Sequence, residues 1–179
     1  MGPRILTVGH GTRPTQAFLA LLRRAGVEVL VDVRRFPSSR RNPQYAREAL
    51  QGALEEAGIA YVWMGEELGG FRSSAPGSRH TALANRSFAG YADHMDTPAF
   101  RRGLERLIAL ARERPTAIMC AETLWWRCHR RMISDALLAA GCEVAHLLDD
   151  GEHPHVLHPN ARVEDGQPVY DVEAEQRLL

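Results

Sequence analysis

Short apolar runs alternate with segments of helical periodicity along most of this chain, and the alternation constrains the fold more than any other feature. The apolar runs are rich in Ile, Leu and Val, and the segments between them repeat apolar residues every three to four positions. The expected strands are 4–8, 27–33, 59–64, 116–121 and 143–148, and the expected helices are 14–25, 46–58, 98–114 and 126–141. Strand–helix–strand repetition predicts a mostly parallel, Rossmann-like sheet of five strands with helices on both faces.

The length of the chain favours a single α/β domain over residues 1–179. With 179 residues, 45% of them hydrophobic, it is long enough for one well-buried core and short for two. The C-terminal extension 152–179 contains "ARVEDGQPVYD", which predicts a small β-hairpin turning at Asp165-Gly166. Segment 65–87 is polar, rich in Gly and Ser, and too long for an ordinary connector, so we expect a flap-like loop or a partly disordered segment there.

Nothing in the chain indicates a membrane or an oxidising compartment. No apolar run approaches the roughly 20 residues that a membrane-spanning helix needs, and the N-terminus lacks the pattern of a secretion signal. The three cysteines are too few, and odd in number, for a disulfide framework. We therefore expect a soluble cytoplasmic protein without membrane contact, whose oligomeric state the sequence leaves open.

The charge is balanced overall but unevenly distributed. Residues 1–131 carry 20 arginines against 12 acidic residues, whereas residues 132–179 carry 2 arginines against 10 acidic residues, and lysine is absent. A guanidinium is a planar fork suited to phosphate or carboxylate. The basic part predicts an anionic partner, either a small molecule or a nucleic acid. Many of these arginines would also fit a solvated helix surface paired with glutamates.

The residues that follow the expected strands are the best candidates for function, because ligands of open parallel sheets bind outside the carboxyl ends of the strands. The candidates for chemistry are His10, Asp32, Cys120 and Glu122. The candidates for substrate binding are Gly9, Gly11, Arg34, Arg35, Arg40, Tyr45, Gly69, Trp126, Arg127, Cys128, His129 and Arg130. We expect these residues to converge on one edge of the sheet.

Each loop also has a structural interpretation. Gly9 and Gly11 would let the backbone approach an anion at a helix start, but the same turn could serve only to connect strand and helix, with His10 as a cap. Asp32 could act in chemistry or pair with Arg34 inside the protein. The loop "RRFPSSRRNP" that follows holds four arginines and suits anion binding, although it would be equally ordinary as a solvated loop.

The segment "MCAETLWWRCHRR" (119–131) concentrates reactive side chains at a strand-to-helix junction. Six residues without glycine separate Cys120 from Arg127, which excludes a cysteine-phosphatase loop, and a rhodanese-like loop also needs smaller residues. Cys120 and Cys128 do not have CxxC spacing, and a zinc site with adjacent Cys128 and His129 would be rare.

Two interpretations of this segment remain. Glu122 would be a general acid, a general base or an arginine partner, and Trp125 or Trp126 would stack on a ring. Alternatively, both cysteines are small buried hydrophobes and the tryptophans close the core. The histidines of "HPHVLHP" (153–159) fit a loop better than a metal site, so we expect neither a metal nor a cofactor.

The ordered motifs "TVGHG", "VDVRRFPSSRRNPQY", "LGG", "FAGYADHMDTPAFRRGLERL" and "MCAETLWWRCHRRMISDAL" resemble a bacterial family catalogued as domain of unknown function 488. The resemblance runs from about residue 4 to beyond the strand "HLL". It implies a compact α/β fold, a cytoplasmic protein and motifs gathered at one edge, but no reaction. The first motif of the family usually ends in Gly-His-Ser, and Gly11 replaces that serine here.

Three functions agree with these features. The first is an enzyme, a hydrolase or transferase, acting on a nucleotide-like or nucleic-acid substrate in an arginine-rich pocket. The second is a non-catalytic nucleic-acid-binding or regulatory module that uses the same arginines. The third is a thiol-based redox or sulfur-transfer protein built on Cys120 and Cys128.

Overall fold

The computed structural model describes residues 2–173 of the chain. Its strands are β1 (Arg4–Gly9), β2 (Val29–Asp32), β3 (Ala60–Trp63), β4 (Thr116–Cys120), β5 (Glu143–Leu148), β6 (Gly151–Pro154), β7 (Arg162–Glu164) and β8 (Gln167–Val169). Its α-helices are α1 (Thr15–Arg24), α2 (Arg47–Glu56), α3 (Gly65–Leu68), α4 (Arg86–Met95), α5 (Pro98–Glu113) and α6 (Arg130–Ala139). Two short 3-10 helices, η1 (Pro43–Tyr45) and η2 (Trp125–Arg127), complete the described elements.

The central sheet has the strand order β3-β2-β4-β1-β5-β6. The first five strands pair in parallel, which confirms the predicted parallel sheet, and β6 pairs antiparallel with β5. The prediction of five strands was therefore one strand short, and the start of the predicted extension 152–179 belongs to the main sheet. The sequence "GEHP" has no alternation of apolar and polar residues, because β6 is a mostly exposed edge strand.

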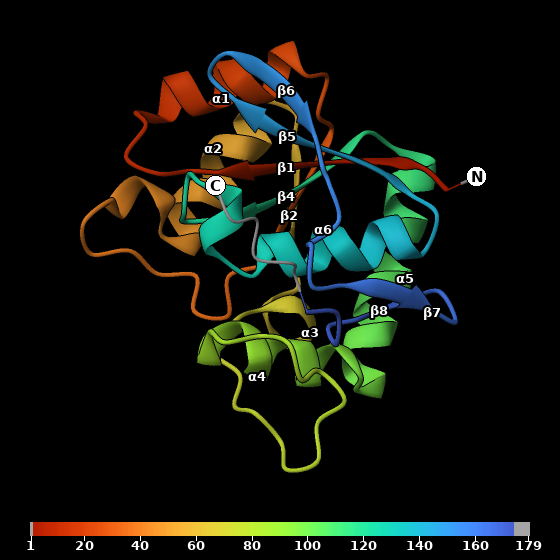
Figure 1. Cartoon of the computed structure of the whole chain (residues 1–179). Coiled ribbons are helices and arrows are strands. Elements are labelled where there is room, and N and C mark those ends of the chain that lie inside the picture. The colour runs from red at the N-terminus through yellow and green to blue at the C-terminus, as the bar shows by residue number, and fades with distance from the viewer. Residues whose placement is uncertain (1, 174–179) are drawn as a thin grey trace.

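Helices cover both faces of the sheet, as predicted. Figure 1 shows α1 and α2 on one side of the strands and α5 and α6 on the other. Side chains alternate between the two faces along each strand. In β1, Leu6 and Val8 pack toward α1 and α2, whereas Ile5 packs toward α5 and α6.

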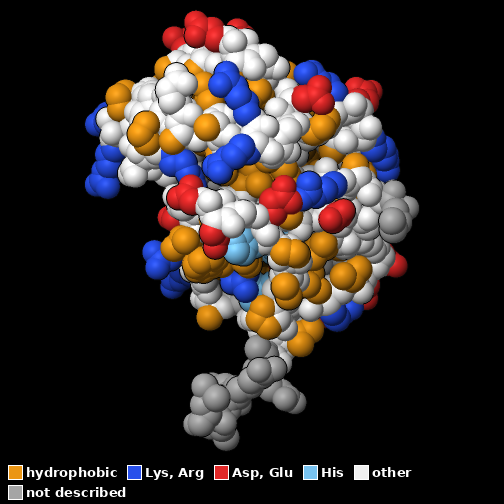
Figure 2. Space-filling view, turned by 90° about the horizontal axis from the view of Figure 1, so that it is seen from above, with side chains coloured by type: hydrophobic (Ala, Val, Ile, Leu, Met, Phe, Trp, Pro, Cys, Tyr) orange, Lys and Arg blue, Asp and Glu red, His pale blue; other side chains and the backbone are white. Residues whose placement is uncertain are grey.

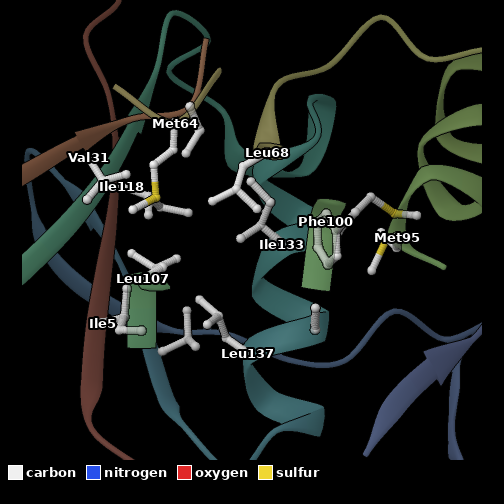
Figure 3. Close-up of a cluster of buried hydrophobic side chains, with 14 of the residues drawn as sticks. Ile5, Val31, Met64, Leu68, Met95, Phe100, Leu107, Ile118, Ile133 and Leu137 are labelled. Carbon is white, nitrogen blue, oxygen red and sulfur yellow. The ribbon is translucent and has the colours of Figure 1, made fainter. Parts of the chain in front are cut away.

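The larger core lies between the sheet and α3 to α6. Ile5, Val31 and Ile118 from the strands meet Leu107 of α5 and Ile133 of α6, and all five side chains are buried (Figure 3). Burying side chains of this size contributes about 1.5–3 kcal/mol each before the entropy of ordering is counted. This core holds the start of α6 firmly against the carboxyl end of β4.

Segment 65–87 contains the short helix α3 and the first residues of α4, and residues 69–85 between them form neither a helix nor a strand. The segment begins with α3 and ends inside α4, which starts after the cap Asn85, whose side chain accepts a hydrogen bond from the Phe88 amide. The apolar face of α4 includes Gly90, where a Cβ would lie 2.1 Å from the Arg72 carbonyl oxygen. A glycine in this position weakens the helical pattern in the sequence.

The helix expected over 126–141 is shorter in the structure, because this part of the chain is divided into η2 and α6.

The predicted C-terminal hairpin is present as β7 and β8. Asp165 and Gly166 have φ values of 51° and 72°, which is the two-residue turn that the Asp-Gly pair favours. Val169 at the end of β8 and Tyr170 after it are buried. Within residues 2–173, no helix is both long and apolar enough to cross a membrane.

Candidate active site

The predicted site residues lie at the carboxyl ends of β1, β2 and β4, but on two different faces of the sheet. The alternation of side chains directs Asp32 toward α1 and α2, in register with Leu30. The same alternation directs Cys120 toward α6, together with Ile118. The residues that the sequence groups together therefore form two separate clusters.

The first cluster is a closed ion pair between Asp32 and Arg34. Arg34 Nε and Nη2 donate to the two Asp32 carboxylate oxygens at 2.9 and 2.8 Å, and the Tyr61 hydroxyl donates to Oδ2 at 2.6 Å. Asp32 is completely buried and Arg34 is 6% exposed. Both side chains are thus engaged within the protein, as in the structural interpretation of this pair.

His10 and Tyr45 extend this cluster. Their rings stack with centroids 4.1 Å apart, and both are buried. His10 Nδ1 donates to the Gly11 carbonyl oxygen at 2.8 Å, so that Nε2 faces Arg34 Nη1 at 3.4 Å. Burial lowers the pKa of His10 to about 4, so the ring is neutral at pH 7. In this arrangement Tyr45 offers no exposed ring to a ligand.

Gly9 at the end of β1 and Gly11 after it allow close packing. A Cβ on Gly9 would lie 1.9 Å from the Glu122 carbonyl oxygen, and Gly11 has a φ of 55°. The amides of His10 and Gly11 donate to the carbonyl oxygens of Cys120 and Ala121 at 2.9 and 3.0 Å. These amides are therefore occupied by the loop after β4 and do not point to a free anion site.

The second cluster brings Cys120 and Cys128 together. Their sulfur atoms lie 3.3 Å apart, although seven residues separate them in the chain. Cys120 is 2% exposed at the end of β4, and Cys128 is half-buried just before α6. The turn η2 folds the connection back, so this spacing gives a thiol pair without the CxxC pattern.

Arg130 holds the pair electrostatically. Its Nε donates to Cys120 Sγ at 2.9 Å and its Nη1 to Thr7 Oγ1 at 3.1 Å, while Nη2 donates to the Thr123 carbonyl oxygen at 3.2 Å. The hydrogen bond from Cys120, together with the charge and backbone amide of Arg130, lowers the pKa of Cys128 to about 5 against the opposing effect of burial. Burial raises the pKa of Cys120. The pair therefore holds a thiolate on Cys128 and a thiol on Cys120.

Cys128 lines a cavity of about 220 Å³, which we call the Cys128 cavity. Its walls are Gly70, Phe71, Ser87, Phe88, Tyr91, Arg127, Cys128 and His129. Phe71 is 81% exposed and has a φ of 62°, a left-handed conformation that is strained for an aromatic residue. Strain of this kind concentrates at ligand sites, and here it holds an aromatic ring at the rim of the cavity.

His129 lines the cavity beside Cys128, and a hydrogen bond determines which of its ring nitrogens carries the hydrogen. Its Nε2 lies 2.8 Å from the Val33 carbonyl oxygen, which can only accept, so Nε2 carries the hydrogen. Burial lowers the pKa of His129, so Nδ1 is unprotonated at neutral pH. Nδ1 faces Gly70, where a Cβ would lie 3.2 Å away. His129 is therefore a candidate general base.

One arginine lies on the wall of the cavity and two more lie near it, one of which, Arg72, donates from Nε to the Gly69 carbonyl oxygen at 3.0 Å. Arg127 lines it, and Arg35 Nη1 donates to the Phe71 carbonyl oxygen at 2.6 Å. Arg72 follows Phe71, and its charge lowers the pKa of His129. Across residues 2–173, no carboxylate lies within 4.0 Å of the guanidinium of Arg35, Arg72 or Arg127. These charges suit an anionic ligand.

The remaining candidates belong to neither cluster. Glu122 is exposed, and its carboxylate accepts from the Leu124 amide at 3.3 Å. Trp126 is 42% exposed and Arg40 is exposed. Gly69 allows close packing, since a Cβ there would lie 2.6 Å from Arg35 Cβ.

A buried chain of hydrogen bonds, which sequence reasoning missed, supports Arg130 from behind. Thr7 Oγ1 contacts His146 Nδ1 at 2.5 Å, His146 Nε2 contacts His155 Nδ1 at 2.8 Å, and His155 Nε2 contacts Asp135 Oδ1 at 2.7 Å. All three side chains beyond Thr7 are buried. His155 and His158 lie in the irregular segment after β6, as the interpretation of "HPHVLHP" as loop histidines predicts, but both are buried, whereas His153 lies in β6. The sequence signal was His146 within an otherwise apolar strand.

The fold and this site define an α/β protein with a paired-cysteine and arginine cavity at the carboxyl edge of a parallel sheet. The chain belongs to the family described as Domain of unknown function DUF488, whose model matches residues 14–137. Neither the comparison with curated proteins nor that with solved structures gave a match.

Proposed function

We propose that this protein is an enzyme that binds a phosphate-bearing, nucleotide-like substrate in the Cys128 cavity and uses the Cys128 thiolate as its nucleophile. The substrate would be a free nucleotide or a unit of a nucleic-acid strand. One observation carries the proposal: Cys128, whose pKa is lowered, lines a cavity together with Arg127, and no carboxylate of residues 2–173 lies within 4.0 Å of the Arg127 guanidinium. Reactive cysteines are found in electropositive, partly exposed surroundings of this kind.

The walls of the cavity suit the two parts of such a substrate. Arg127 lies on the wall, so a phosphate group has a cationic donor to bind there. Arg35 and Arg72 lie nearby, and each donates to a backbone carbonyl oxygen. Phe88 and Tyr91 supply apolar surface, and the exposed rings of Phe36 and Phe71 lie 5.9 Å apart at the rim. Aromatic surfaces of this kind stack on bases.

Basic and acidic side chains are interspersed on the face of the molecule shown in Figure 2. The zero net charge agrees with this mixture. A protein that binds long duplexes usually presents a continuous basic surface. The arginines around a single cavity therefore favour a small ligand or a short single-stranded segment.

The residues of the cavity divide the chemistry between them. The Cys128 sulfur would form a bond to an electrophilic atom of the substrate, while the bond to the leaving group breaks and the leaving group takes its electron pair. His129 Nδ1 would then accept the proton of the water or acceptor that displaces the product from Cys128. Water as the acceptor makes the protein a hydrolase, and any other acceptor makes it a transferase.

The proposal is tested by incubating the protein with mononucleotides and short single-stranded oligonucleotides, followed by mass spectrometry of protein and ligand. We expect a covalent adduct or a changed ligand with the wild type and with the control Cys142→Ser, whose thiol is buried away from the cavity, but not with Cys128→Ser. Arg127→Gln should weaken binding about tenfold or more. Binding without chemical change would indicate a non-catalytic module, and the absence of binding would refute the proposal.

A further inference from the structure

Cys120 and Cys128 have a geometry that nucleophilic attack by Cys128 alone does not require. A single nucleophile needs one accessible sulfur, yet a second thiol lies 3.3 Å behind it. Two side chains from separate elements converge there, Cys120 from the end of β4 and Cys128 from the turn before α6. We propose that the two cysteines form a redox-active dithiol that reduces small disulfides carrying negative charge.

The exposure of the two sulfurs assigns them different roles. Cys128 is half-buried and lines the cavity, whereas Cys120 is 2% exposed and lies behind it. A disulfide entering the cavity therefore meets Cys128 first. Cys120 is out of reach of the substrate but next to the Cys128 sulfur, which is the position of a resolving thiol.

The charges around the pair favour the same order of events. The thiolate is the attacking species in thiol–disulfide exchange. Arg130 Nε donates to Cys120 Sγ at 2.9 Å, so the charge of the pair is stabilised from the protein side. Arg127 on the cavity wall would bind the carboxylate of an incoming disulfide, and Phe88 and Tyr91 would contact its apolar part.

The exchange balances in two steps. In the first, the Cys128 thiolate bonds to one sulfur of the substrate disulfide, the substrate S–S bond breaks, and a thiolate leaves. In the second, Cys120 Sγ bonds to Cys128 Sγ, and the bond between Cys128 and the substrate sulfur breaks. The Cys120 proton goes to the second departing thiolate. The protein loses two electrons and the substrate disulfide gains them.

The aromatic, dicarboxylated disulfide 5,5′-dithiobis(2-nitrobenzoate) is a suitable probe, because each exchange releases a coloured thiolate. With limited reagent and Cys142→Ser as the background, we expect each reacting protein to release two coloured thiolates and to end as an internal Cys120–Cys128 disulfide. Peptide mapping would locate that disulfide. Cys120→Ser in the same background should release one coloured thiolate and retain the mixed disulfide on Cys128.

Retention of the mixed disulfide in the Cys142→Ser protein, with Cys120 still open to alkylation after unfolding, would overturn the dithiol. The dithiol would also be overturned if Cys120 in the Cys128→Ser variant reacted with the reagent as fast as the protein that retains Cys128. The dithiol would use the same cavity as the proposed enzyme, but it is detected by the formation of the Cys120–Cys128 disulfide and not by a change in a nucleotide. Nucleotide chemistry without an internal disulfide would leave only the proposed function standing, and the reverse result would leave only the dithiol.

Discussion

Arg130 should set the reactivity of the thiol pair, and replacing it with methionine tests this. Arg130 Nε lies 2.9 Å from Cys120 Sγ, which lies 3.3 Å from Cys128 Sγ. The charge of Arg130 is therefore within about 6 Å of the Cys128 sulfur. At an effective dielectric constant of about 20, that separation corresponds to about 2.8 kcal/mol, or about two pKa units. Since a cation favours the thiolate, removing it raises the pKa of Cys128.

The assay is the rate of iodoacetamide alkylation of Cys128 between pH 4 and pH 9 in the Cys142→Ser background. From a pKa of about 5 in the parent protein, Arg130→Met should move the midpoint to about 7. At pH 6 the thiolate fraction, and with it the rate, should fall about tenfold.

The control is Arg130→Lys, which keeps the charge but loses the fork that reaches Thr7 and the Thr123 carbonyl oxygen. We expect this variant to lose stability while its midpoint moves by much less than that of Arg130→Met. Near-ultraviolet circular dichroism establishes that both variants are folded. An unchanged midpoint in folded Arg130→Met would refute the electrostatic reasoning.

Two further predictions concern the protonation of His10 and the close packing of Gly9. The pKa of His10 is about 4 in the folded protein and about 6.5 when unfolded, so the unfolded state binds the proton first and stability is lost as the pH falls from 6.5 to 4, by up to about 3 kcal/mol. Urea unfolding of His10→Phe should show a shallower loss over this range, and an unchanged slope would contradict the assignment. Gly9→Ala should destabilise the fold by several kcal/mol, because its Cβ would meet the Glu122 backbone, whereas Gly52→Ala, in open space on α2, should stabilise it by about 0.5–1 kcal/mol. Equal thermal shifts in the two variants would refute the packing argument.

The sequence predicts the helices and strands better than it predicts which side chains contact one another. Strong apolar runs identify β1 to β5, and the carboxyl-edge rule places the candidate residues at the right end of the sheet. Strand periodicity also puts Leu30 and Asp32 on one face, but it does not say which helix covers that face. The sequence therefore leaves open whether Asp32 faces a ligand or an arginine, and the structure pairs it with Arg34.

The cysteines show the opposite limitation. Spacing rules describe local turns, and Cys120 and Cys128 match none of them. They meet because one core cluster holds β4 and α6 against each other, and η2 closes the path between them. A contact set by tertiary packing has no signature in the seven intervening residues. The sequence also hides α4, because Gly90 stands where a larger apolar residue would have marked the buried face.

The hydrogen-bonded chain behind Arg130 relates the cysteine site to the rest of the fold. A guanidinium only donates and a carboxylate only accepts, so donation runs in one direction, from Arg130 through Thr7, His146 and His155 to Asp135. Because arginine does not give up its proton in proteins, this chain positions Arg130 and does not carry protons to the thiols.

Three residues of this hydrogen-bonded series lie outside residues 14–137, the part of the polypeptide that the family model matches. They are Thr7, His146 and His155. A fragment limited to that part would lack β1 and β5, which flank one another in the sheet, and with them the acceptor of Arg130 Nη1. The arginine that sets the thiolate would then be held only by Cys120 and the loop after β4. The arrangement of Arg130 beside the two cysteines therefore depends on residues outside the segment that the family model matches.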